Sequence, residues 1–109
     1  MGKPTAYVQK DNVSLSEIVN NLQGKKVILH ERFGVTRIGV FGSIVRGDHT
    51  TSSDLDIIVE MEEDKKNLHS FLELKRYLER ETARCVDLGF EHSLKPLIKE
   101  TIKKQIVYV

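Results

Sequence analysis

The chain has 109 residues, of which 39% are hydrophobic and 30% charged, a composition typical of a folded globular domain. Its 17 basic and 16 acidic side chains leave a formal net charge of +1, which argues against a nucleic-acid-binding surface because phosphate contacts need a basic excess. The lone cysteine excludes an internal disulfide, and no apolar run approaches the roughly 20 residues of a membrane span. We expect one cytoplasmic domain over residues 14–109, preceded by a loose polar leader over residues 1–13 without a signal peptide.

A capping box and an amphipathic stripe predict helical structure after the leader. Ser14 and Glu17 have the spacing at which each side chain satisfies a free backbone amide at a helix start. The apolar residues that recur at helical spacing are Leu15, Ile18, Val19, Leu22, Ile28, Leu29 and Phe33. Gly24 interrupts this pattern, so either one kinked helix or two short helices fit the segment that Gly34 ends.

Three segments rich in β-branched and aromatic residues predict strands, over residues 36–41, 54–61 and 85–90. A short helix over residues 43–46 and a polar loop over residues 47–53 separate the first two strands. Leu68, Phe71, Leu72 and Leu78 predict the inner side of a helix over residues 66–81.

The C-terminal segment predicts one more helix. Pro96 suits its first turn, where a missing amide costs nothing, and four residues predict its inner face: Leu97, Ile98, Thr101 and Ile102. The apolar tail over residues 106–109 is too short to assign.

This order of elements predicts an α/β (α+β) domain, in which helices pack on one face of a small mixed sheet. Side-chain alternation indicates how the two faces are used. On the second strand, Leu55, Ile57 and Val59 share one face, while Asp54, Asp56 and Ile58 share the other. On the third strand, Asp87 lies on the face opposite Val86 and Leu88. One face therefore packs under helices while the other presents three carboxylates.

Two acids one residue apart on a strand lie about 6–7 Å apart on the same face. Like charges that close raise one another's pKa unless a cation lies between them. Mg²⁺ prefers such oxygen ligands and binds one or two carboxylates together with substrate phosphates. Asp54 and Asp56 therefore predict a magnesium site, and Asp87 would supply a third carboxylate, enough for two ions. The competing interpretation is a set of solvated acids on an open sheet.

Gly42 and Ser43 stand where the first strand meets the short helix. Backbone amides at a helix start, a glycine that permits close approach and an adjacent hydroxyl together suit a phosphate. Alone, the pair also fits a plain turn; the downstream acids favour a nucleoside triphosphate site, and with it phosphoryl or nucleotidyl transfer.

The arrangement of these motifs resembles the nucleotidyltransferase motif of the DNA polymerase β superfamily, and in particular its minimal nucleotidyltransferases. The likeness extends from Leu15 to the C-terminus and consists of Gly42-Ser43, Arg46-Gly47, Asp54-Leu55-Asp56 and Val86-Asp87-Leu88. Asp48 stands where these proteins often have glutamate, and Gly89 where an aliphatic residue is common.

The resemblance implies a polymerase β-like fold and a role for each matching residue. Gly42, Ser43 and Arg46 would bind the triphosphate of ATP. Asp54, Asp56 and Asp87 would bind two Mg²⁺ ions and form the catalytic set, with Asp87 the candidate for activating the attacking hydroxyl.

Minimal nucleotidyltransferases are often paired with a helical ribonuclease toxin of the HEPN class, which implies a HEPN-type partner and a role as its antitoxin. The enzyme hypothesis is Mg²⁺-dependent transfer of AMP from ATP to a tyrosine of that partner. The alternatives are a non-catalytic antitoxin that only binds the toxin, and an adenylyltransferase for a small molecule such as an aminoglycoside. The sequence leaves the acceptor, the base preference and any homo-oligomer open.

The sequence also predicts the environment of Cys85 and of His49. Cys85 has no histidine near it in sequence, so we expect a buried small hydrophobic side chain rather than a nucleophile. His49, in the predicted loop, is a surface residue or a contact to phosphate.

Overall fold

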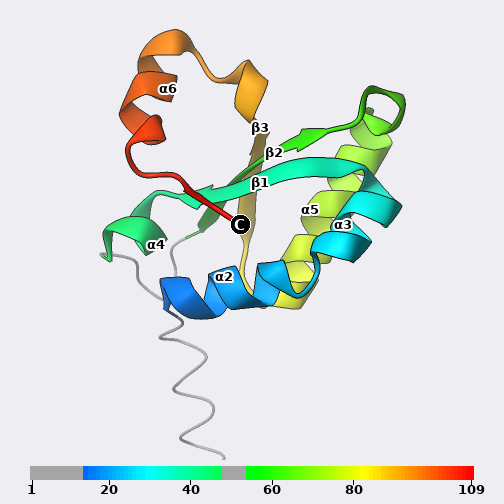
Figure 1. Cartoon of the computed structure of the whole chain (residues 1–109), viewed down its shortest axis with the longest axis horizontal. Coiled ribbons are helices and arrows are strands. Elements are labelled where there is room, and N and C mark those ends of the chain that lie inside the picture. The colour runs from blue at the N-terminus through cyan, green and yellow to red at the C-terminus, as the bar shows by residue number, and fades with distance from the viewer. Residues whose placement is uncertain (1–13, 48–53) are drawn as a thin grey trace, which may run out of the picture.

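The computed structural model describes residues 14–47 and 54–109, which form one mixed sheet with helices on its two sides (Figure 1). The sheet has the strand order β3-β2-β1-β4. Strand β1 (Val35–Phe41) is antiparallel to β2 (Leu55–Met61) and to β4 (Val107–Tyr108), whereas β3 (Val86–Phe90) is parallel to β2. The predicted α/β class with a small mixed sheet is confirmed. The leader expected over residues 1–13 lies outside the described residues.

The N-terminal helical segment forms two helices, α2 (Leu15–Gln23) and α3 (Lys26–Phe33). The predicted capping box begins α2, because the Ser14 side chain accepts a hydrogen bond from the Glu17 amide and the Glu17 side chain accepts one from the Ser14 amide. Gly34 ends α3 with φ of 71°, a left-handed conformation that glycine adopts without steric cost. Of the two arrangements that the sequence permits, the one with two short helices is the one observed.

Helix α5 (Leu68–Thr82) follows a short 3₁₀ turn, η1 (Glu63–Lys65), and begins where the Asn67 side chain accepts a hydrogen bond from the Ser70 amide. Its buried residues are Leu74, Tyr77, Leu78 and Thr82. The predicted inner side is confirmed for Leu78, which is buried, and for Phe71, which packs against the core. It is wrong for Leu68 and Leu72, which are 72% and 41% exposed. The stripe that meets the sheet begins one turn later and is rotated around the helix.

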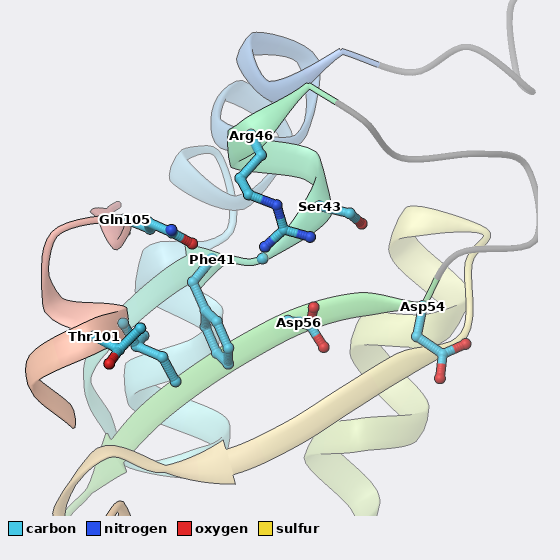
Figure 2. A pocket seen from close by; sticks show the side chains of 9 residues that line it. Phe41, Ser43, Arg46, Asp54, Asp56, Thr101 and Gln105 are labelled. Atoms are coloured by element: carbon cyan, nitrogen blue, oxygen red, sulfur yellow. The ribbon is translucent and has the colours of Figure 1, made fainter. Parts of the chain in front are cut away.

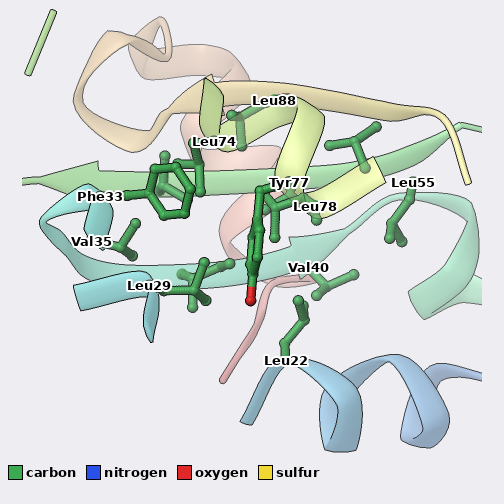
Figure 3. Packing of buried hydrophobic residues seen from close by; sticks show 14 of the residues in the cluster. Leu22, Leu29, Phe33, Val35, Val40, Leu55, Leu74, Tyr77, Leu78 and Leu88 are labelled. Atoms are coloured by element: carbon green, nitrogen blue, oxygen red, sulfur yellow. The ribbon is translucent and has the colours of Figure 1, made fainter. Parts of the chain in front are cut away.

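The core lies between α2, α3 and α5 and one face of the sheet (Figure 3). The side chains that fill it from the helices include Leu22, Leu29, Phe33, Leu74 and Leu78. From the sheet, Val40, Leu55, Ile57 and Val59 meet them, and each is 0–1% exposed. At roughly 25 cal/mol per Å² of apolar surface, burial of such side chains is the main stabilising contribution. The predicted face of β2 is thus the core face.

Helix α6 (Pro96–Lys103) differs from the prediction. Pro96 does occupy its first turn, but none of its residues is buried, and Leu97 is 81% exposed. The helix lies on the side of the sheet opposite α2, α3 and α5 (Figure 1), between a second 3₁₀ turn, η2 (Glu91–Ser93), and β4. Its expected inner face is uncovered because α6 is attached at its two ends and does not pack flat on the sheet.

The C-terminal tail holds one of those ends in place. Strand β4 pairs with β1, and the Val109 amide donates to the Ile38 carbonyl at 2.9 Å. Gly39 lies directly beneath the tail: a Cβ built on it would lie 2.8 Å from Cγ2 of Ile106 and 3.1 Å from Cδ1 of Tyr108. The close approach of β4 therefore requires glycine at position 39.

Replacement of Gly39 by alanine should reduce the free energy of unfolding by about 1–3 kcal/mol, the usual cost of overpacking. The matched control is Gly89→Ala, because a Cβ at that strand position meets no atom within 4 Å and alanine lowers the entropy of the unfolded chain. Urea denaturation of the two variants measures the difference. Equal stability of both would contradict the packing described for β4.

Candidate active site

The turn from β1 into α4 (Ser43–Arg46) places a glycine against a carboxylate. Gly42 has φ of 82° and ψ of −147°, a conformation that L side chains rarely adopt. A Cβ at this position would overlap Oδ2 of Asp56. Glycine is therefore required here both by the backbone conformation and by the approach of the Asp56 carboxylate to the backbone.

The register of the sheet brings the predicted acids together. Asp56 on β2 is the register partner of Asp87 on parallel β3, so their Cα atoms lie about 4.8 Å apart on the same face. Asp54 directly precedes β2, and the Leu55 amide donates to the Cys85 carbonyl at 2.8 Å, which fixes this end of the strand beside β3. By alternation, Asp54 shares the face of Asp56.

Cys85 belongs to the same face as Asp87 by the same alternation, and it is exposed. The expectation that it is a buried hydrophobic side chain is therefore wrong. Asp48 and His49 lie outside the described residues.

The electrostatic environment of Asp56 is unusual for a surface acid. Partial burial raises its pKa, the carboxylates of Asp87 and Asp54 raise it further, and the Arg46 guanidinium lowers it. The net direction is upward, and burial is its largest cause. Negative charge at this position is incompletely compensated by the described residues around it.

An open pocket of about 620 Å³ lies at this position (Figure 2), within the usual range of small-molecule sites. Five of the predicted site residues line it, and we call them the polar end: Gly42, Ser43, Arg46, Asp54 and Asp56. Asp87 does not line the pocket; it lies beside Asp56 in the register.

Sequence reasoning missed the opposite side of the pocket. Phe41 lines it from β1, and three further residues form what we call the α6 wall: Thr101, Ile102 and Gln105. Thr101 and Ile102 belong to the helix face that was expected to be buried. Phe41 could have been found from its place opposite Asp56 in an antiparallel pair, but no sequence signal marked Gln105.

The chemistry of the polar end suits Mg²⁺. Carboxylate oxygens are its preferred protein ligands, and one or two suffice when phosphates complete the shell. In the part of the chain that the structure describes, no three acidic, histidine or cysteine side chains converge closely enough to hold one ion. Asp56 and its register partner Asp87 offer carboxylate oxygens on one sheet face, and Asp54 offers a further carboxylate in the pocket, so these residues are suited to hold Mg²⁺ together with substrate phosphates.

Fold and site together define a nucleotide-transferring enzyme. The chain belongs to the nucleotidyltransferase domain family, whose profile matches residues 22–109, which confirms the class that the motifs predicted. It is 46% identical over 97 residues to the protein adenylyltransferase MntA of Thermococcus cleftensis, covering 89% of this chain and 97% of that protein.

Solved structures agree with this assignment. A structure described as a minimal nucleotidyltransferase matches with a TM-score of 0.70 and 32% identity, covering 84% of this chain and 92% of that one. A Shewanella oneidensis complex of an MNT antitoxin with a tri-AMPylated HEPN toxin matches with a TM-score of 0.53, covering 80% and 68%. Its 23% identity makes this a likeness of fold. None of the helices in the described ranges, 14–47 and 54–109, has the length and apolar character needed to cross a membrane.

The raised pKa of Asp56 predicts how Asp56→Asn behaves without metal. The folded protein holds the Asp56 proton more tightly than the unfolded chain, so stability from protonation is complete below the unfolded pKa and is lost as pH rises through the folded pKa. Asparagine is uncharged at every pH and so resembles the protonated form of Asp56. At neutral pH and in EDTA, the variant should melt at the same temperature as the wild type or higher, and any gain should disappear in acid.

Thermal unfolding over a pH series measures this difference. Asp64→Asn is the control, because Asp64 is an exposed acid in η1, outside the pocket, and it should leave the melting temperature unchanged. A lower melting temperature for Asp56→Asn at neutral pH would contradict the prediction and assign Asp56 a structural role.

Proposed function

We propose that this nucleotidyltransferase is a Mg²⁺-dependent protein adenylyltransferase, which transfers AMP from ATP to a tyrosine hydroxyl of a HEPN-type partner and so acts as its antitoxin. The observation that carries the proposal is the register of Asp56 with Asp87 beside the close approach of Gly42. Carboxylates for a metal and a turn that admits phosphate lie next to each other on the open sheet face. The adenylyltransferase relative supports the substrate class, and the solved complex of an MNT antitoxin with a HEPN toxin supports the partner.

The polar end of the pocket would hold the triphosphate. The Ser43 hydroxyl and the Arg46 guanidinium are side-chain groups there that can donate hydrogen bonds to phosphate oxygens, beside the backbone amides at the start of α4. Asp54, Asp56 and Asp87 would hold Mg²⁺, which when bound neutralises phosphate charge and lowers the pKa of a coordinated hydroxyl. These residues would fix the position of the α-phosphate relative to the acceptor.

In the transfer step, the acceptor hydroxyl oxygen forms a bond to the α-phosphorus of ATP. The bond from that phosphorus to the oxygen bridging the α- and β-phosphates breaks, and pyrophosphate leaves. The hydroxyl proton passes to a carboxylate, for which Asp87 is our candidate. Its place next to Asp56 and outside the pocket lining leaves it accessible to an acceptor that arrives from outside.

An acceptor on a separate protein fits the exposure of this region. Asp87 is exposed and lies on β3, an edge strand of the sheet. The described chain therefore leaves that side of the site uncovered, and a protein surface carrying a tyrosine can reach it.

Incubation of the chain with a HEPN-type partner, ATP and Mg²⁺ tests the proposal by intact-mass spectrometry. The partner should gain one or more AMP units. Asp54→Asn should abolish the gain, and Asp87→Asn should slow it at least a hundredfold, the lower range for loss of general-base catalysis.

Asp64→Asn is again the control and should transfer AMP at the wild-type rate. A partner that binds tightly and never changes in mass would replace the proposal with that of a non-catalytic antitoxin. Full activity of Asp54→Asn would overturn the assignment of the metal ligands.

A further inference from the structure

The pocket has two chemically different sides. The polar end carries carboxylates, a guanidinium and a hydroxyl, whereas Phe41 and the α6 wall carry no charged side chain. A ligand that fills both sides must be highly charged at one end and uncharged at the other. A nucleoside triphosphate has this division, with the base and ribose at its uncharged end.

The α6 wall is an unfilled surface that faces the pocket. Ile102 is only half-buried, and α6 has no buried residue, so the sheet does not cover the face that carries Thr101 and Ile102. The Thr101 hydroxyl donates to the Leu97 carbonyl at 3.2 Å, which keeps the side chain folded back on its helix. The surface of α6 that faces the pocket is therefore largely apolar.

Phe41 provides the surface that faces the α6 wall. It is the register partner of Asp56 in the antiparallel β1–β2 pair, so the ring and the carboxylate lie on the same sheet face. In Figure 2 the ring projects into the pocket between Thr101 on α6 and Asp56 on β2. An aromatic ring beside a phosphate site is a surface on which a base can stack.

Gln105 adds hydrogen-bonding groups to this apolar region. Its backbone amide donates to the Ile102 carbonyl at 2.7 Å and closes the turn after α6, and its side chain lines the pocket. A carboxamide offers one acceptor and one donor side by side, which match N6 and N7 of adenine. Guanine presents acceptors at both O6 and N7, so one of the two contacts would be repulsive.

From this arrangement we infer that the nucleoside of the substrate lies between Phe41 and the α6 wall, and that Gln105 selects adenine over guanine. The inference rests on the proposed function, to which it adds the base preference. The C-terminal segment then selects the base, whereas the phosphates and the metal are bound by β1, α4 and β2.

The test compares Mg²⁺ complexes of ATP, GTP and inorganic tripolyphosphate by isothermal titration calorimetry. The wild type should bind ATP at least tenfold more tightly than GTP. Gln105→Ala should reduce that ratio to about one, and Ile102→Ala should weaken both nucleotides about five- to hundredfold. Tripolyphosphate has no nucleoside, so its affinity should be the same in all three proteins.

Gln23→Ala is the matched control, because Gln23 is an exposed glutamine at the end of α2 and does not line the pocket. It should keep the wild-type ratio. An unchanged ratio in Gln105→Ala, or a parallel loss of tripolyphosphate binding in either variant, would overturn the inference and leave the proposed function intact. A wild type that binds neither nucleotide nor tripolyphosphate would overturn both.

Discussion

Asp56 presents its carboxylate where burial and two neighbouring carboxylates all favour its neutral form. The sheet enforces this position, since the register with β3 places Asp87 alongside and the turn at Gly42 meets the carboxylate from the other side. Hydrogen bonds of the strands and burial of the core residues hold these elements together, so the acids cannot separate. A bound cation would relieve the repulsion, so the proposed chemistry uses a position that the fold imposes at a cost in stability.

Local patterns predicted the elements of this fold because the physical causes are local. The capping box at Ser14 and the left-handed Gly34 act within one turn of chain, and both lie at helix ends as expected. Alternation on β2 predicted which side chains enter the core. The exposed positions of Leu68 and Leu72 could not be predicted, because helical spacing alone does not say which of two apolar stripes meets the sheet.

In the candidate site, too, local sequence patterns predicted one part and missed the other. The residues of the polar end are close in sequence and belong to a recognisable motif, and the structure brings them around one pocket. The α6 wall reaches the pocket only through tertiary contacts, above all the pairing of β4 with β1 over Gly39. Such contacts leave no periodic signal, and the apolar face of α6 was therefore assigned to the core.

The two faces of the sheet have different roles. The helices of the core side stabilise the sheet, and the pocket lies on the opposite face, where residues of α4 and α6 line it. In the proposed reaction, the acceptor would approach past Asp87, which is exposed on an edge strand, and would belong to another molecule.

The role that we propose for the carboxylate cluster around Asp56 is to bind a cation and a triphosphate. Isothermal titration of ATP into the chain, with Mg²⁺ and then with EDTA, tests it most directly. The wild type should bind ATP only when Mg²⁺ is present, and Asp56→Asn should lose that binding. Equal affinity for ATP with and without Mg²⁺, or undiminished binding by Asp56→Asn, would contradict it.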